Sequence, residues 1–302
     1  MISVVIPHFN QPDALELCLQ SLVRQRSVTK TAIEIVVVDN GSAELPTAVK
    51  NYQDVRLEVE LRPGPGPARN KGIAVTTGDI VAFVDADCVS DAHWLERIEH
   101  AFKSAAVSII GGQVTVPYKT PGQPSFNEPY ERVYAYRNEM YIASGFSGAG
   151  NMAARRSVFD AVGEFSGIEV AEDREWGLRA KAQGYKTIYV EDMIVYHPAR
   201  ESFNELTRKW DRQTAHDFAD LRSGLRGRLM WIAKALGLLA SPFADIPKLA
   251  TTAKLGSNYE RWLAFRCLLK IRVYRCQRML ALLLLRSGRE SSTHWRGEDT
   301  PD

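Results

Sequence analysis

The sequence has few cysteines and no long uninterrupted hydrophobic run, and each shortage excludes a class of protein. Four cysteines occur in 302 residues, none in C-x-x-C spacing, which excludes a zinc ribbon, a redox dithiol and a disulfide framework. The longest uncharged apolar runs, residues 235–244 and 279–285, are too short to cross a bilayer. The N-terminus also lacks the basic and apolar regions of a signal peptide. We therefore expect a cytoplasmic protein without a transmembrane helix.

Two common phosphate-binding motifs are missing as well. Residues 63–72 form a loop rich in glycine and proline, but they have neither the P-loop spacing nor the G-x-G-x-x-G spacing of dinucleotide folds. ATP hydrolysis and nicotinamide chemistry are therefore disfavoured. The loop can either bring backbone amides and Arg69 towards a phosphate or serve as a rigid connection.

The composition is that of a globular protein, with an uneven distribution of charge. Hydrophobic residues make up 45% of the chain and charged residues 25%, which excludes disorder as the main state. The net charge of +2 hides a split, because residues 1–199 carry 19 basic and 25 acidic side chains and residues 200–302 carry 19 and 11. The two parts of the chain therefore face different surroundings.

The first 200 residues alternate short β-branched runs with helical patterns. Apolar strand patterns cover residues 2–6, 33–38, 55–61, 80–84, 107–110, 187–190 and 193–196, and helical patterns cover residues 13–23, 67–75, 91–102, 152–159 and 172–183. This alternation predicts an α/β fold with a mostly parallel sheet flanked by helices on both faces.

Polar residues follow three of the predicted strands, at residues 7–10, 39–42 and 85–87. Ligands of open α/β sheets bind at the carboxyl ends of strands, so these residues predict a crevice with two acidic corners that suits a divalent cation, a nucleoside or both. Asp85 and Asp87 are either cation ligands or part of a solvated turn and helix cap. Asp39 either accepts an N–H from a nucleobase or closes an Asx-turn.

Seven segments in order resemble the inverting family 2 glycosyltransferases, which have the GT-A fold. They are residues 3–7, 37–42, 68–72, 83–87, 148–156, 172–179 and 195–198, and the resemblance covers about residues 1–200. It implies transfer of a sugar from a nucleoside-diphosphate sugar to an acceptor hydroxyl with inversion. It further implies a GT-A catalytic domain over residues 1–200, with a nucleotide-sugar half of about 1–115 and an acceptor half of about 116–200.

The resemblance also implies roles for individual residues. Asp173 would be the general base, with Glu172 beside it as the alternative. Asp87, His197 and Asp85 would hold Mn²⁺ or Mg²⁺ near the diphosphate. The implied nucleotide-sugar contacts are Pro7, Phe9, Asn10, Asp39, Asn40, Arg69, Asn70, Asp85 and Ala86, and the implied acceptor-side residues are Gly148, Ala149, Gly150 and Asn151. From the residues alone, His197 is also explained as a turn or core histidine, and the Glu172–Asp173 pair as ordinary charge at a helix N-terminus.

The region after Pro198 has no motif that we can assign. Residues 221–289 hold 14 basic and two acidic side chains among apolar ones, which predicts a basic helical region over 201–289. Such a region either contacts an anionic membrane peripherally, on the inner face of the cell membrane, or packs on protein. The sequence has no groove-reading motif, so we expect no nucleic-acid partner. Residues 290–302 are polar and are expected to form a flexible tail.

These observations favour a metal-dependent glycosyltransferase that uses a nucleotide-sugar donor and a glycan or lipid-linked acceptor. Cell-surface polysaccharide or glycolipid synthesis is the process we expect it to serve. Two alternatives stay open, a non-catalytic nucleotide-sugar-binding scaffold and a nucleotidyltransferase of similar fold. The latter would release pyrophosphate instead of a nucleoside diphosphate.

Overall fold

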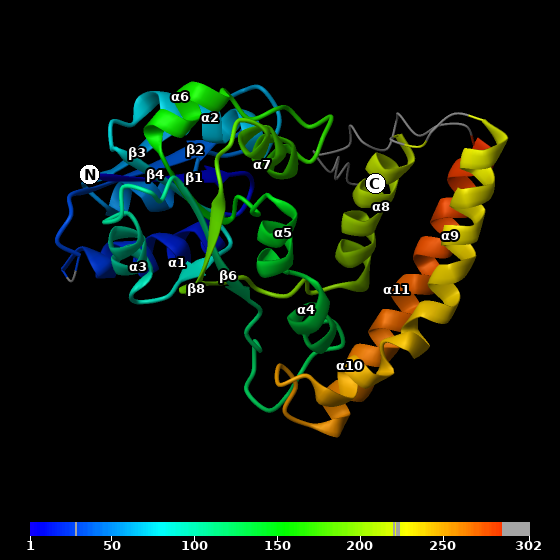
Figure 1. The fold of residues 1–302 in the computed structure, drawn as a ribbon. Helices are drawn as coiled ribbons and strands as arrows, with labels where there is room; N and C mark the ends of the chain where they lie inside the picture. The colour runs from blue at the N-terminus through cyan, green and yellow to red at the C-terminus, as the bar shows by residue number, and fades with distance from the viewer. Residues whose placement is uncertain (28, 220, 222–223, 286–302) are drawn as a thin grey trace. The chain divides into compact units, whose positions relative to one another are not determined.

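The computed structural model describes residues 1–302 except 28, 220, 222, 223 and 286–302, so the expected tail at 290–302 lies outside the described residues. The backbone divides into two compact units (Figure 1). The first unit comprises residues 1–115 and 137–197. The second comprises residues 116–136 and the chain from residue 198 onwards.

An eight-stranded sheet forms the centre of the first unit. Its strands are β1 (Ile2–His8), β2 (Ile33–Asp39), β3 (Val55–Val59), β4 (Ile80–Val84), β5 (Val89–Ser90), β6 (Ile109–Thr115), β7 (Asn151–Arg155) and β8 (Thr187–Tyr196). They lie in the order β3-β2-β1-β4-β7-β6-β8-β5. Strands β1 to β4 are parallel neighbours, β7 runs antiparallel between β4 and β6, and β8 is parallel to β6. The carboxyl ends of β1, β2 and β4 therefore lie at one edge of the sheet.

Helices cover both faces of this sheet (Figure 1), and they bury alternate residues of the central strands on opposite sides. Val4 and Ile6 of β1 belong to a buried cluster with α1 (Pro12–Val23) and α3 (Trp94–Ala101). Val5 belongs to a second cluster, which includes residues of α2 (Pro65–Val75), α6 (Arg156–Val162) and α7 (Glu172–Ala182). The helix α5 (Asn138–Ser144) contacts β6 and β8. This arrangement confirms the predicted fold class.

Two predicted elements differ from the structure. Residues 152–159 were expected to be helical, but Asn151–Arg155 form strand β7 and the helix α6 begins at Arg156. The two short strands expected at 187–190 and 193–196 are one strand, β8, because its pairing with β6 continues past an irregularity between Gly112 and Gln113.

The second unit is helical. Its elements are α4 (Glu128–Tyr134), α8 (Phe203–Ala219), α9 (Leu225–Ala244), α10 (Ile246–Thr251) and α11 (Asn258–Leu285). The basic C-terminal helical region is therefore present as expected. Residues 116–136, which were expected in an acceptor half, pack with these helices instead. The physical reason is a buried cluster that joins Tyr130 and Val133 of α4 to Leu206, Leu249 and Leu268. Tyr130 stacks on Tyr134 within α4, which favours a packed helix face over a sugar-binding platform.

One helical segment bears on the expectation that no transmembrane helix is present. Residues Leu225–Thr251 are long and apolar enough to cross a membrane by length and composition, and little of that segment is buried. The uncharged run at 235–244 is too short alone, but apolar residues on both sides of Lys234 extend it.

Candidate active site

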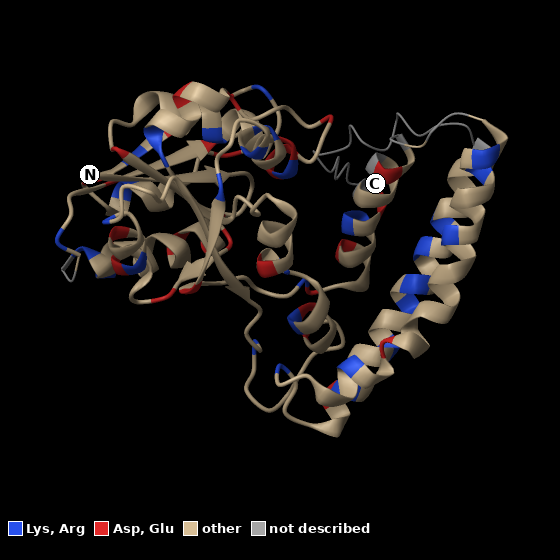
Figure 2. Ribbon diagram, viewed as in Figure 1, with Lys and Arg blue, Asp and Glu red and all other residues tan. Residues whose placement is uncertain are grey.

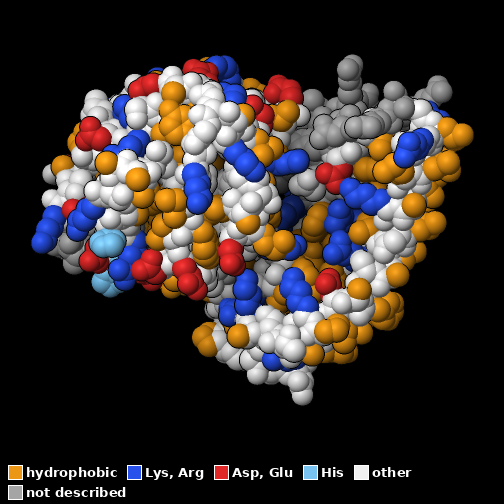
Figure 3. Space-filling view, viewed as in Figure 1, with side chains coloured by type: hydrophobic (Ala, Val, Ile, Leu, Met, Phe, Trp, Pro, Cys, Tyr) orange, Lys and Arg blue, Asp and Glu red, His pale blue; other side chains and the backbone are white. Residues whose placement is uncertain are grey.

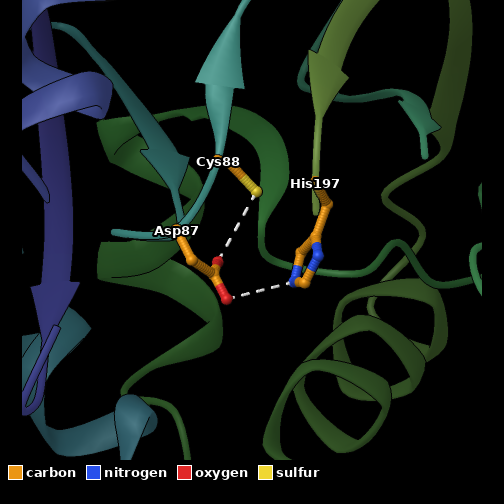
Figure 4. A group of neighbouring side chains, drawn as sticks. All are labelled: Asp87, Cys88 and His197. Atoms are coloured by element: carbon orange, nitrogen blue, oxygen red, sulfur yellow. Dashed lines mark hydrogen bonds and ion pairs between the residues drawn. The ribbon is translucent and has the colours of Figure 1, made fainter. Parts of the chain in front are cut away.

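The chain turns sharply where β4 ends, and this turn carries two carboxylates. The backbone N–H of Cys88 donates to the carbonyl of Asp85 at 3.0 Å, which holds Asp85 and Asp87 in a tight turn. The backbone N–H of His197, just after β8, donates to the carbonyl of Thr115 and so fixes the position of His197. The Nε2 atom of His197 lies 3.3 Å from Oδ2 of Asp87 (Figure 4).

Asp87, His197 and Cys88 form a group that could hold a cation. Their ligand atoms all lie within 4.8 Å of one another, and Figure 4 shows the three side chains converging. Burial raises the pKa of the Cys88 thiol well above its usual range, so the thiol stays protonated and is a poor ligand. The remaining donors, a carboxylate and an imidazole, suit Mn²⁺ and, less well, Mg²⁺. Asp87 and His197 therefore fit the predicted metal.

Arg69 joins the β4 turn to the beginning of α7. The guanidinium of Arg69 is buried and donates to Oδ1 of Asp85 and to Oε1 of Glu172, each at 2.9 Å. The GPG-containing loop places Arg69 there because α2 begins at Pro65 and carries Arg69 in its second turn. Two carboxylates, Asp85 and Glu172, which are 87 positions apart in the chain, are thereby held together. Arg69 was expected to contact phosphate, whereas its terminal nitrogens contact carboxylates in this structure.

Asp173 follows Glu172 in the first turn of α7. Burial and the negative charge of Glu172 together raise the pKa of Asp173 to about 6, against the opposing effect of the charge of Arg69. Its Oδ1 atom accepts a hydrogen bond from the N–H of Arg174 at 2.7 Å. A carboxylate with such a pKa is ionised near neutral pH and still basic enough to take a proton from a hydroxyl.

The loop before β7 lies against these carboxylates. A Cβ atom on Gly150 would lie 2.3 Å from Oδ2 of Asp85, and one on Gly148 would lie 3.8 Å from Oδ2 of Asp173. Ala149, which lies between these two glycines in the sequence, is buried. Asn151 is fully buried, where its side chain accepts from Trp94 Nε1 and donates to the carbonyls of Gln113 and Met193. Gly148 and Gly150 therefore adjoin the carboxylates, while the side chain of Asn151 holds strands and α3 together.

The ends of β1 and β2 form a hydrogen-bonded pair. Nδ1 of His8 lies 2.9 Å from Oδ1 of Asp39, and both side chains are buried. Oδ2 of Asp39 accepts from the N–H groups of Gly41 and Ser42. Burial raises the pKa of Asp39, but the hydrogen bonds from Ser42 and His8 outweigh it and the pKa is lowered overall. Asp39 is thus ionised and closes an Asx-turn, which was one of its two expected roles.

The other residues expected to bind the donor have structural partners. Asn40 is buried and binds the backbone of Glu60, Arg62 and Gly64. Asn70 exchanges two hydrogen bonds with the backbone of Phe165. In the exposed turn after β1, Asn10 bonds to Ser42 and Ala43. Pro7 and Phe9 flank His8, partly exposed, and Ala86 is buried in the β4 turn.

Sequence reasoning did not select two neighbours of these residues, His8 and Cys88. His8 on β1 contacts Asp39 on β2. The side chain of Cys88 contacts that of its neighbour Asp87 because of the way the chain turns there. His8 lies within the polar strand end noted at residues 7–10, so its position was a usable signal, since Pro7, Phe9 and Asn10 beside it were selected.

The model of the family described as Glycosyl transferase family 2 matches residues 3–163. Glycosyltransferase AglE of Haloferax volcanii is 32% identical over 219 residues, which are 69% of this chain and 70% of AglE. An uncharacterized glycosyltransferase of Escherichia coli, YibD, is 42% identical over 91 residues, which are 28% of this chain and 26% of YibD.

Two solved structures share the fold. The mannosyltransferase PcManGT from Pyrobaculum calidifontis, in complex with GDP-Man and Mn²⁺, matches with a TM-score of 0.57 and 20% identity over 95% of this chain and 87% of its own. A TarS fragment from S. aureus, in complex with UDP-GlcNAc, matches with a TM-score of 0.52 and 19% identity over 79% of this chain and 66% of its own. These likenesses confirm the expected GT-A fold.

Proposed function

Because the chain belongs to glycosyl transferase family 2, we propose that it transfers a hexosyl or related sugar from a nucleoside-diphosphate sugar to an acceptor hydroxyl, with inversion and with Asp173 as the base. The observation that carries this proposal is the Arg69 bridge between Asp85 and Glu172. It brings the turn that carries Asp85 and Asp87 next to the helix that carries Asp173. A donor held at the turn would thus have a proton acceptor beside it.

The chemical step needs no covalent intermediate. The carboxylate of Asp173 takes the proton of the acceptor hydroxyl as its oxygen bonds to the anomeric carbon. The bond from that carbon to the diphosphate breaks, and the nucleoside diphosphate leaves with the electron pair. Attack and departure on opposite faces of the sugar give inversion. Glu172 keeps the pKa of Asp173 raised and therefore supports its role as the base.

Asp87 and His197 would hold a divalent cation, Mn²⁺ or Mg²⁺, with Asp85 close to them. The bound cation would neutralise charge on the departing diphosphate. Asp39 and its neighbours Pro7, Phe9, Asn10 and Asn40 would surround the nucleoside, since they lie at the ends of β1 and β2. Gly148, Ala149 and Gly150 would face the acceptor, because their loop lies against the carboxylates of Asp85 and Asp173.

The acceptor is a glycan or a lipid-linked glycan, and the protein acts in cell-surface polysaccharide or glycolipid synthesis. Support comes from the basic and apolar second unit, which suits a protein placed peripherally on the inner face of an anionic cell membrane. A cytoplasmic site would give the enzyme its nucleotide-sugar donors.

The proposal is tested with a panel of nucleotide-sugars that includes GDP-mannose and UDP-GlcNAc, each with Mn²⁺ or Mg²⁺. We expect one donor to raise the melting temperature of the protein only in the presence of the cation. Asp173→Asn should keep that shift but lower transfer by roughly 10²–10⁴-fold, because only the proton acceptor is lost. Asp87→Asn should lose both the shift and the transfer.

Asp160→Asn is the matched control, since Asp160 is exposed on α6 in the same unit. It should leave binding and transfer unchanged. Normal transfer by Asp173→Asn would overturn its role as the base, and release of pyrophosphate instead of nucleoside diphosphate would overturn glycosyl transfer.

A further inference from the structure

Helix α9 is covered along only one narrow stripe. Gly227, Trp231, Ala235 and Pro242 are buried, and their spacing of about four residues places them on one side of the helix. On that side α11 packs against α9. Trp231 Nε1 donates to the carbonyl of Met279 at 2.9 Å, and the rings of Phe243 and Phe265 lie 6.0 Å apart. The rest of the helix is left without cover from the described part of the second unit.

A second side of α9 is apolar and exposed, and at its C-terminal end it meets α11 through Phe243. Leu225, Leu229, Leu236 and Phe243 fall on one stripe at helical spacing, and their exposed fractions are 74%, 57%, 52% and 59%. We call these four residues the outer stripe. Figure 3 shows hydrophobic side chains along the outer edge of α9. A surface helix normally exposes polar residues there, so another apolar medium or partner must cover this stripe.

The charges beside the outer stripe favour an anionic bilayer over a second copy of the chain. Arg226 and Arg228 are exposed at the beginning of α9, and Lys234, two turns later, pairs with Asp217 of α8 at 3.3 Å. Figure 2 shows further basic residues spaced along α11. Two such surfaces would repel each other, whereas basic side chains around an apolar stripe are attracted to anionic headgroups and can extend towards them.

Near its C-terminal end, α9 meets a second apolar feature. A cavity of about 310 Å³ is lined by Ile246, Leu249, Ala250, Arg261, Trp262 and Phe265 of α10 and α11. Trp262 is half-exposed and stacks with Tyr259, and both residue types are enriched where proteins meet the headgroup layer. The cavity has the size and the apolar lining to take part of one acyl chain.

The packing of α11 decides how α9 meets the bilayer. The two helices lie side by side from the Trp231–Met279 contact to the Phe243–Phe265 contact, so α9 cannot cross the bilayer without α11. The middle of α11 carries Lys270 and Arg275, which lie over the rings of Phe203 and Trp210 in α8. A charged helix packed against α8 does not enter the acyl core. Helix α9 therefore lies in the plane of the membrane.

We propose that the outer stripe of α9, with the adjoining cavity at α10, is the surface through which the protein docks on an anionic lipid bilayer. This inference deepens the proposed function, because a surface-bound enzyme would meet lipid-linked acceptors by moving in two dimensions. It depends on that function only for its purpose, since the lipid contact can be measured without a donor or an acceptor.

The test is flotation of the full chain with vesicles of phosphatidylglycerol and phosphatidylcholine, and with vesicles of phosphatidylcholine alone. The variant Leu236→Gln/Phe243→Gln should bind the anionic vesicles at least roughly tenfold more weakly. The reason is that two large apolar side chains are no longer transferred from water into the bilayer. The control Leu17→Gln/Leu61→Gln changes two apolar residues of the first unit that are also more than half exposed, and it should bind as the unchanged protein does. Arg226→Gln/Arg228→Gln should lower anionic binding on the order of tenfold.

Several outcomes would overturn the docking surface. Equal flotation of all variants would be one. Another would be a wild-type dimer that Leu236→Gln/Phe243→Gln converts to monomer, because that result would assign the stripe to a contact with a second copy of the chain. Retention on vesicles after an alkaline wash would overturn the in-plane position in favour of a span. The donor-induced rise in melting temperature, measured on the same samples, separates the two proposals. It should persist in the Leu236→Gln/Phe243→Gln variant, whereas Asp87→Asn should lose it and still float.

Discussion

The side chain of Asp173 has a pKa that its neighbours set in opposite directions. Burial and the charge of Glu172 raise that pKa to about 6, and the charge of Arg69 lowers it. The base is active only as a carboxylate, so transfer should fall as the pH drops through about 6. Both charges adjoin the carboxylate, and each gives its own test of this assignment.

We predict that neutralising Glu172 and neutralising Arg69 move the acid limb of the pH–rate profile in opposite directions. Glu172→Gln removes a negative neighbour, so the pKa of Asp173 falls and the limb moves to lower pH. Arg69→Gln removes a positive neighbour, so the pKa rises and the limb moves to higher pH. The measurement is kcat/KM against pH, with Asp160→Asn as the variant that leaves the limb in place. Shifts in the same direction would contradict the electrostatic origin of the limb.

Single-residue roles could be predicted from the sequence only where position along a strand identified them. Asp85, Asp87 and Asp39 were selected because each ends a buried strand, and the structure places all three at one edge of the sheet. The two carboxylate contacts of Arg69 could not be predicted, because they join residues 16 and 103 positions away. The structural use of Asn151 depends on three elements that are distant in the chain, so no local pattern contains it.

At the scale of elements, the parallel half of the sheet was predictable and the antiparallel insertion was not. Strands β1, β2 and β4 are runs of β-branched and apolar residues buried on both faces. Strand β7 contains Met152, Ala153, Ala154 and Arg155, which favour helix when taken alone. Pairing with β4 on one side and β6 on the other overrides that preference. Such an override cannot be read from a window of the sequence.

Helix α2 carries Arg69, and its distance from the sheet depends on Gly72. A Cβ atom on Gly72 would lie 2.1 Å from Cγ1 of Val5. We predict that Gly72→Ala lowers the free energy of unfolding by about 1–3 kcal/mol, because the helix must move away from β1. Val5→Ala removes the clashing methyl groups, so the double variant should be more stable than the sum of the two single changes predicts. Urea unfolding of the four proteins measures this coupling, and simple additivity would contradict a direct contact.

On the scale of the whole molecule, each of the two units has buried apolar clusters of its own. Two clusters lie in the first unit, around Val4 and around Val5, and two lie in the second, around Leu268 and around Trp231. The residues of the candidate active site all belong to the first unit. Ligand binding should therefore stabilise the units unequally.

We predict two transitions in calorimetric unfolding of the full chain, of which the donor and Mn²⁺ raise only one. Binding to the native first unit stabilises that unit by mass action, and the second unit binds neither ligand. The variant Asp87→Asn provides the control, since the temperatures of both of its transitions should stay the same when the donor is added. A single transition that moves as a whole would contradict independent unfolding of the units.

The interrupted chain order of the units has a practical consequence for protein engineering. The polypeptide leaves the first unit after Thr115, returns at Arg137 and leaves again after His197. A truncation that stops near residue 200 would keep α4 but delete the helices that bury Tyr130 and Val133. The fragment would therefore expose an apolar helix surface that promotes aggregation. A catalytic fragment would instead need a linker that joins Thr115 to Arg137 in addition to the C-terminal cut.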